Sequence, residues 1–252
     1  MNCATAVMAL TGIWDTGLGR AFYKSFLEQD RWQLYLSGLG RTLEVTVLAL
    51  LLGTVLGVIT ALIRVGHDQR RPGRVTPGSV IISALNWLVK LYITVIRGTP
   101  MVVQLMILGF VVFKSSRNFT MVGVLGLGIN SGAYVSEIIR SGLMSVDQGQ
   151  MEAGRSLGLS YLTTMVNVVI PQAVKNILPA LGNEFITLLK DTSLISVIAG
   201  KELLYAAKAV AAKTYDFMFP LLGVSVAYLI MVILFTMLLG AFERRLRASD
   251  HR

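Results

Sequence analysis

The chain has 252 residues, of which 54% are hydrophobic and 15% charged, and its mean hydropathy is +0.66. Soluble domains carry about 25% charged residues. Because the apolar residues here also gather in long runs, the composition excludes an ordinary soluble domain and predicts an integral membrane protein. Alternating apolar and polar segments are scarce, which favours an all-α membrane fold over a β-barrel. The net charge of +9 is typical of cytoplasmic loops and contacts with membrane lipids, so we expect no nucleic-acid partner.

The first forty residues are expected to form a periplasmic or interfacial segment, residues 1–40. Residues 4–13 are apolar but too few to span, and no basic stretch precedes them, which argues against a cleaved signal peptide. Aromatic residues then alternate with charged ones up to Tyr35, a pattern typical of the headgroup level. A poorly ordered terminus is the alternative. The single Cys3 excludes an internal disulfide framework.

Five membrane-spanning helices are predicted within a domain of residues 41–245. The first covers residues 43–63, where Gly53 and Gly57 form a small-xxx-small face for close helix packing. Residues 80–113 are too many for one straight span. We therefore expect an interfacial segment, a kink at Gly98-Thr99-Pro100 and a second span through Phe113, with Lys90 and Arg97 near the cytoplasmic face. The remaining spans are expected at residues 120–139, 178–198 and 219–240.

The orientation follows from the basic loop at residues 64–78, which contains four arginines and is typical of the cytoplasmic side: Arg64, Arg70, Arg71 and Arg74. Five spans then place the N-terminus outside and the tail, residues 246–252, in the cytoplasm. Lysines and arginines are nearly balanced over the two sides. The prediction therefore depends on the density of charge in the first loop and the tail.

A polar stretch, residues 141–170, lies between the third and fourth spans. Ser145 and Asp147 each precede a Gln by three residues, the spacing of a capping box. Glu152 falls early in the predicted helix, where the helix dipole favours an anion, and Gly158 is a suitable C-terminal stop. We therefore predict a short surface helix over about residues 148–157. From these residues alone, an ordinary interhelical loop is an equal alternative.

Polar residues recur on one face of the third span and one face of the fourth. Asn130, Tyr134 and Glu137 share a face of the third. The fourth carries five polar residues within a sector of about 120°: Asn183, Glu184, Thr187, Lys190 and Asp191. Because polar groups in a membrane face the bundle interior or a water-filled path, both faces are candidates for a solute pathway. Pairing among these side chains is the alternative.

The mixed charges on these faces suit a solute with two charges. Glu137 and Asp191 are candidates to meet an ammonium group. Lys190 and Arg97 are candidates to meet a carboxylate. The same mixture also suits internal pairing, so it does not decide between the two interpretations.

No catalytic constellation is evident in the sequence. His67 and His251 have no partners at ligand spacing, and no Cys/His cluster could hold a metal. Gly200-Lys201-Glu202 lacks the upstream glycine and the following Ser or Thr of a phosphate loop. We expect no cofactor, no metal and no enzymatic activity. Active transport would therefore draw its energy from a partner or from an ion gradient.

Several motifs, in order, resemble the permease subunits of bacterial ABC importers, specifically the polar amino-acid uptake group. Glu152-Ala153-Gly154, then Gly158 and Ile170-Pro171, resembles the family's EAA loop, although members usually have a second Ala at the position of Gly154. The resemblance covers about residues 38–245. It extends to further stretches: Arg97-Gly98-Thr99-Pro100 with Gln104, Ala133-Tyr134-Val135-Ser136-Glu137-Ile138-Ile139-Arg140, Gly149-Gln150, Pro171-Gln172-Ala173 and Lys190-Asp191-Thr192-Ser193-Leu194.

The resemblance implies a type I importer permease in the bacterial cytoplasmic (inner) membrane, with a second permease subunit, identical or paralogous, completing the pathway. A cytoplasmic ABC ATPase dimer would dock on the EAA helix, and an extracytoplasmic amino-acid-binding protein would deliver the substrate. Gly154 is expected to loosen that helix, since Gly costs a helix about 1 kcal/mol relative to Ala. The implied ATPase-coupling residues are Gln150, Glu152, Ala153, Gly154, Arg155 and Gly158. The candidate substrate-pathway residues are Arg97, Gln104, Asn130, Tyr134, Glu137, Asn183, Glu184, Thr187, Lys190 and Asp191.

Two rival functions remain open at this point. An ion-coupled secondary amino-acid transporter would use Glu137 and Asp191 to carry protons or sodium, but five spans without an inverted repeat argue against it. A membrane scaffold without transport would tolerate neutralisation of both polar faces.

Overall fold

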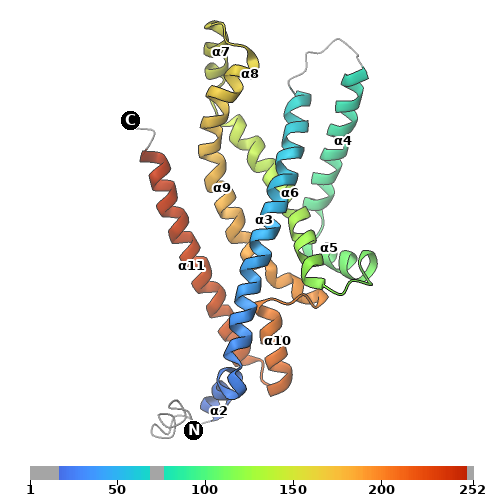
Figure 1. Cartoon of the computed structure of the whole chain (residues 1–252), viewed down its shortest axis with the longest axis vertical. Coiled ribbons are helices and arrows are strands. Elements are labelled where there is room, and N and C mark those ends of the chain that lie inside the picture. The colour runs from blue at the N-terminus through green and yellow to red at the C-terminus, as the bar shows by residue number, and fades with distance from the viewer. Residues whose placement is uncertain (1–16, 69–76, 249–252) are drawn as a thin grey trace.

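The computed structural model describes residues 17–68 and 77–248, and within them the regular elements are helices that form a tall bundle (Figure 1). Some of the sequence predictions lie outside the described residues. These concern residues 1–16 with Cys3, the three arginines of the basic loop within residues 69–76, and the end of the tail, residues 249–252.

Four helices of the described part are long and apolar enough to cross a membrane. They are Glu28–Asp68, which contains α3 (Trp32–Asp68), α4 (Pro77–Gly98), α6 (Phe119–Met144) and Met218–Leu246, most of α11 (Met218–Ala248). At 1.5 Å per residue, the 37 residues of α3 extend about 55 Å. Because a bilayer's hydrocarbon core is about 30 Å thick, α3 projects beyond it.

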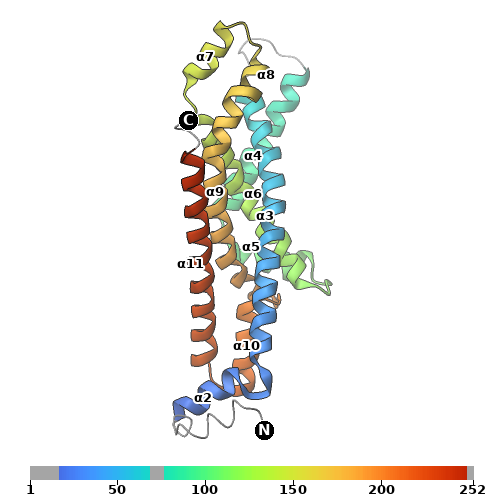
Figure 2. The ribbon, with the colours of Figure 1, turned by 60° about the vertical axis from the view of Figure 1, so that its left-hand side comes forward.

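A fifth helix, α9 (Ile170–Asp191), has the same length as α4, 22 residues, and extends about 33 Å. It contacts α6, α3 and α11, and runs along the bundle beside α11 (Figures 1 and 2). Its polar side chains lower its hydropathy, and for this reason it is not among the four apolar spans. The predicted five-helix bundle is thus confirmed, with α9 as its most polar member.

The two ends of the bundle carry different short elements (Figure 1). At one end, called here the α2 end, lie α2 (Gly17–Phe26), the 3-10 turn Glu28–Asp30 and α10 (Leu203–Thr214). At the other, the α7 end, lie α7 (Gln148–Ser156) and α8 (Tyr161–Thr164), together with the last turns of α3 and the first turns of α4. The last helix, α11, leads from the α2 end toward the α7 end, as an odd number of spans requires.

Close packing between α3 and α6 forms the centre of the bundle. A Cβ added to Gly53 would lie 2.8 Å from the Cβ of Ser131, and one added to Gly57 would lie 2.5 Å from Cγ1 of Val135. The predicted small-xxx-small face of α3 is therefore confirmed, because only glycine lets the two helices approach this closely. Apolar side chains from five elements fill the space beside this contact: Val45, Ala49, Leu105, Leu127, Leu188 and Ile195.

The second span is predicted on the wrong side of the Gly98-Thr99-Pro100 break. The span is α4, which ends at Gly98, and not the segment that leads to Phe113. That segment forms only α5 (Met101–Ile107) and one π-helical turn (Leu108–Val112), together too short to cross. Pro100 is extended, with φ −65° and ψ 132°. Proline disfavours helix in the residue before it, so the break ends a span instead of kinking one.

Two cations of α4 therefore lie farther from the α7 end than the sequence predicts. Arg97 stands in the last turn of α4, and 20 helical residues, or about 30 Å, separate it from Pro77 at the α7 end. Lys90 also lies in the half of α4 farther from Pro77. With the loop between α3 and α4 on the cytoplasmic side, as the sequence predicts, the expectation that both lie near the cytoplasmic face is wrong.

The helix expected over residues 178–198 begins and ends earlier. Its first turn contains Pro171, a favoured position for proline, and it continues through Pro179. After Asp191 the chain tightens into the 3-10 segment Thr192–Ile198. Residues 203–214, within a stretch expected to be loop, form α10, with Glu202 as its N-cap.

Candidate functional site

α7 is a short helix at the α7 end of the bundle, and both of its ends are capped. Asp147 Oδ1 accepts a hydrogen bond from the Gly149 amide at 2.6 Å. At the other end Gly158 has φ +84°, its amide donates to Arg155 O at 3.0 Å, and the Leu159 amide donates to Gly154 O at 3.1 Å. These paired bonds are those of a Schellman motif. The predicted surface helix and its stop at Gly158 are confirmed.

The two capping boxes expected from the sequence are not formed. Asp147 caps α7 without its reciprocal partner, and the side chains of Ser145 and Gln150 bind α6 and α9 instead. Ser145 Oγ donates to Gly142 O at 2.7 Å and accepts from Asn176 Nδ2 at 2.8 Å, so this residue closes α6 and does not open α7. Gln150 Oε1 accepts from Gln172 Nε2 at 3.3 Å and does not reach back to Asp147. These two bonds connect the beginning of α7 and the end of α6 to α9.

Gly154 is the buried residue of α7, and it faces α8. A Cβ at this position would lie 2.4 Å from Cγ2 and 2.8 Å from Oγ1 of Thr164. Thr164 is itself fully buried, and its hydroxyl donates to Ser160 O at 3.0 Å. The sequence suggests that Gly154 acts by loosening the helix, whereas the structure gives it a packing role: α7 rests directly on α8 because no side chain intervenes.

The opposite side of α7 is exposed. We call four exposed residues of α7 and its C-cap, Glu152, Ala153, Arg155 and Leu157, the α7 surface. Leu157 is 82% exposed, and Leu162 nearby on α8 is 72% exposed. Exposed leucines beside charged groups, on a part of the chain that lies outside the apolar spans, are typical of a protein contact surface.

Part of the predicted substrate-pathway set joins neighbouring helices. Glu184 on α9 accepts a hydrogen bond from Ser131 Oγ of α6 at 2.7 Å. Asn130 Nδ2 donates to Gln104 Oε1 at 3.2 Å, and Gln104 Nε2 donates to Ile96 O at 2.7 Å. Gln104 therefore binds a free carbonyl near the end of α4 and links α5 to α6. The sequence singles out Glu184 but not its partner, since a serine among small residues gives no polar signal of its own.

Two further residues of the predicted substrate-pathway set, Glu137 and Tyr134, each contact an arginine. Glu137 forms an ion pair with Arg64, whose side chain is only 12% exposed. Arg64 lies on α3, which continues to Asp68, and not in the loop where the sequence places it. The guanidinium of Arg97 lies 5.1 Å from the ring centroid of Tyr134, a cation–π distance. Internal pairing, the alternative left open by the sequence, thus describes Glu137.

The remaining members form an exposed polar stripe along α9. Asn183, Thr187 and Lys190 are exposed and recur at the spacing of one helical face, while Asp191 is half-buried. Within the described part of the chain, Asn183 Nδ2 donates to Pro179 O of its own helix, at 3.1 Å. Polar groups on a membrane-crossing helix avoid lipid and face water or another protein surface.

Comparisons with known proteins agree with this architecture. Residues 78–248 match the family described as binding-protein-dependent transport system inner membrane component. The arginine transport system permease protein of Bacillus subtilis is 36% identical over 220 residues, which are 85% of this chain and 93% of that protein. The L-cystine transport system permease protein of the same organism is 34% identical over 242 residues, 95% of this chain and 97% of that protein.

A solved structure is similar as well. It is a crystal structure of an amino acid ABC transporter with histidines. One of its chains superposes with a TM-score of 0.76 at 40% identity, covering 87% of this chain and 98% of that chain.

Proposed function

Because this chain belongs to the family of binding-protein-dependent transport system inner membrane components, we propose that it carries a polar amino acid through the bacterial inner membrane as a permease of an ABC importer. Members of this family work with a binding protein and a separate ATPase, and they are transport subunits, not enzymes. The amino-acid substrate is supported by the names of the relatives, which specify arginine, cystine and an amino acid transporter. The ion-coupled alternative has no support among them.

The single observation that carries the coupling proposal is the α7 surface. α7 is capped at both ends, rests on α8 through Gly154, and exposes Glu152 and Arg155 away from the bundle. We propose that this surface fits a cleft on one monomer of the ATPase dimer and that the α7 end faces the cytoplasm. Residues 141–170 are then the coupling loop, residues 41–245 the transmembrane domain, residues 1–40 an outer segment and residues 246–252 a cytoplasmic tail.

The contacts around α7 give this proposal a mechanical route. α8, the π-helical turn Met165–Val169 and α9 follow one another without a break. Displacement of α7 would press on α8 at the Gly154 contact, and the Gln150–Gln172 hydrogen bond would draw α9 in the same direction. ATP-driven closure of the ATPase would thus move α9, and with it the polar stripe. This is a two-state element that a ligand biases, as allosteric coupling requires.

A second permease subunit is proposed because the polar stripe of α9 has no cover among the residues that the structure describes. Asn183, Thr187 and Lys190 are exposed on a helix that crosses the membrane. A second subunit facing this stripe would enclose a polar path between the two copies and remove these groups from lipid. Gln104, Asn130, Glu137 and Glu184 would then hold the helices that flank the path.

Uptake by the reconstituted complex tests the coupling proposal. We expect Glu152→Ala and Gly158→Leu to abolish substrate-stimulated ATP hydrolysis and uptake while the permease folds normally, since the first removes a contact and the second forces a side chain into a left-handed turn. Glu243→Ala, at another acid of the described chain on α11, is the matched control and should transport normally. Normal uptake by both α7 variants at normal expression would refute the proposal.

A further inference from the structure

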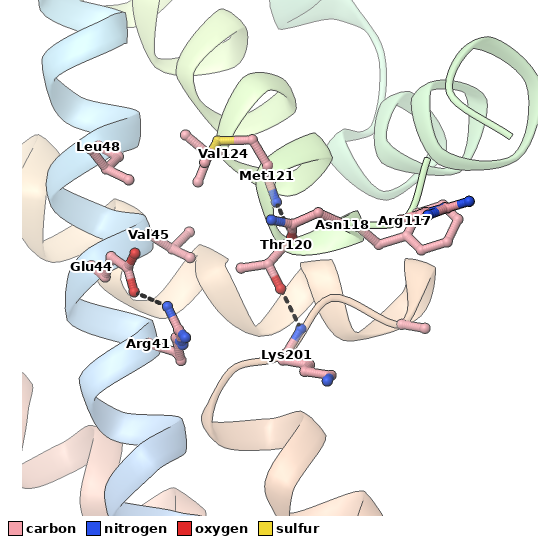
Figure 3. Close-up of a pocket in the computed structure, with 12 residues that line it drawn as sticks. Arg41, Glu44, Val45, Leu48, Arg117, Asn118, Thr120, Met121, Val124 and Lys201 are labelled. Atoms are coloured by element: carbon pink, nitrogen blue, oxygen red, sulfur yellow. Dashed lines mark hydrogen bonds and ion pairs between the residues drawn. The ribbon is translucent and has the colours of Figure 1, made fainter. Parts of the chain in front are cut away.

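A pocket of about 440 Å³ lies toward the α2 end of the bundle, between α3, the beginning of α6 and the segment before α10 (Figure 3). Lys201 N donates to Thr120 Oγ1 at 2.9 Å, which holds the segment before α10 against α6. This pocket lies at the end of the bundle opposite α7 and has no part in the proposed coupling to the ATPase.

The charge of the pocket is predominantly positive. Arg41, Arg117 and Lys201 line it with Glu44 as the one acid among its lining residues. Arg41 and Glu44 form an ion pair at 2.6 Å. For the side chains of Arg117 and Lys201 the described residues provide no ion pair, so two cations remain available to an external anion.

The polarity of the pocket changes along the bundle axis. Figure 3 shows Arg41, Glu44 and Lys201 on the side of α10, and Leu48 and Val124 farther along α3 and α6. Val45 and Val124 are buried in the floor, whereas Leu48 and Met121 are exposed at its rim. The pocket thus has a cationic outer end and an apolar inner end.

The apolar end continues into the exposed face of α3. At 100° per residue, the face of Arg41 and Glu44 also carries Leu48 and three further exposed residues, all within a sector of about 80°: Leu51, Val55 and Leu62. Leu51 is 59% and Leu62 66% exposed, on a helix apolar enough to span a membrane. Exposed apolar side chains of a spanning helix face hydrocarbon, so the pocket opens toward lipid.

From this arrangement we propose that the pocket binds one anionic phospholipid. Its phosphate would lie beside Lys201, the Arg117 side chain would turn toward it from the position drawn in Figure 3, and an acyl chain would lie along Leu48 and the exposed face of α3. Lysine and arginine side chains close to a bilayer surface attract anionic lipid headgroups. An acidic side chain of the binding protein would satisfy the same cations but would not account for the apolar half. The lipid would bridge α3, α6 and the segment before α10.

Native mass spectrometry of the intact importer, purified from a membrane that contains phosphatidylglycerol, tests this proposal. Removing two cations near a headgroup is expected to weaken phosphatidylglycerol binding about thirtyfold in Arg117→Gln/Lys201→Gln. Lys114→Gln/Lys213→Gln removes the same charge from exposed positions outside the pocket and should retain the wild-type amount. Leu48→Trp keeps every charge but fills the apolar end of the pocket, and should also reduce the amount of phosphatidylglycerol retained.

Equal phosphatidylglycerol retention in the pocket variant and the matched control would overturn the proposal. So would unchanged retention together with weaker affinity for the binding protein, measured in nanodiscs of phosphatidylcholine alone, because the pocket would then belong to a protein contact. The proposal stands independently of the coupling role of α7, since neither measurement involves ATP hydrolysis.

Discussion

Replacing Gly154 by alanine sets two effects of opposite sign against each other. Helix propensity favours alanine by about 1 kcal/mol. Packing opposes it, because the new methyl group would lie 2.4 Å from Cγ2 and 2.8 Å from Oγ1 of Thr164. Thr164 is fully buried, and a β-branched side chain has little rotamer freedom with which to yield. Overpacking of this kind costs about 1–3 kcal/mol, so we expect Gly154→Ala to weaken the contact between α7 and α8 by about 1 kcal/mol net.

Hydrogen–deuterium exchange of the α7 amides measures this contact directly, because opening is local and exchange reports local opening. A net loss of about 1.4 kcal/mol corresponds to tenfold faster exchange, so Gly154→Ala should accelerate α7 exchange by about five- to tenfold. Amides in α6, away from the contact, should keep their wild-type rates. Substrate-stimulated ATP hydrolysis should fall in parallel if the contact transmits force.

Thr164→Ala provides the compensating change. It removes Cγ2 and Oγ1, and leaves the Thr164 Cβ at 3.2 Å from the added methyl. Ser160 O still accepts the backbone amide of residue 164 at 3.0 Å, so no buried carbonyl is left unpaired. The double variant should therefore exchange no faster than wild type. Slower exchange in Gly154→Ala alone would refute the reasoning, since helix propensity would then outweigh packing.

Three further predictions concern single side chains. Glu137→Gln should destabilise the protein by about 2 kcal/mol in chemical unfolding, because Arg64 would keep a largely buried charge without its carboxylate. The double variant Arg64→Met/Glu137→Met should recover most of this loss of stability. An unchanged stability of Glu137→Gln would show that the ion pair contributes nothing. Burial raises the pKa of the Glu202 carboxyl, so the stability it contributes is greatest below the usual pKa of glutamate, about 4.3, and falls as pH rises through the raised value. Glu202→Gln should remove that dependence, and a wild-type-to-variant difference in Tm that is constant with pH would contradict it. Gly158→Ala should cost about 1–2 kcal/mol locally because φ is +84°, seen as faster exchange at Leu157 and Leu159; unchanged exchange would mean that the turn tolerates a side chain.

Features encoded within one helical turn could be predicted from the sequence. α7 was such a case, because Asp147 and Gly158 fix both of its ends through hydrogen bonds to residues two to five positions away. The spacing of Gly53 and Gly57 also indicates that this face of α3 packs closely against another helix, although it does not indicate that the partner is α6. Helix count and the polar face of α9 follow from periodicity in the same way.

Contacts between distant segments could not be predicted. Nothing near Gly154 in the sequence indicates that Thr164 lies over it, and nothing near Glu137 indicates Arg64 on another helix. The position of the second span could not be predicted for a different reason. Hydropathy continues through Gly98-Thr99-Pro100 into α5, so composition did not show which side of the break crosses the membrane.

The central claim, that the α7 surface binds the ATPase, is tested most directly by the accessibility of one exposed residue. Ala153→Cys, in a chain with Cys3→Ser, places a single thiol on that surface. Its rate of maleimide labelling should be high in the permease stripped of ATPase and fall at least tenfold when the ATPase is bound. Lys114→Cys, away from the α7 end, should label equally in both states. Equal labelling of Ala153→Cys with and without a bound, active ATPase would contradict the account.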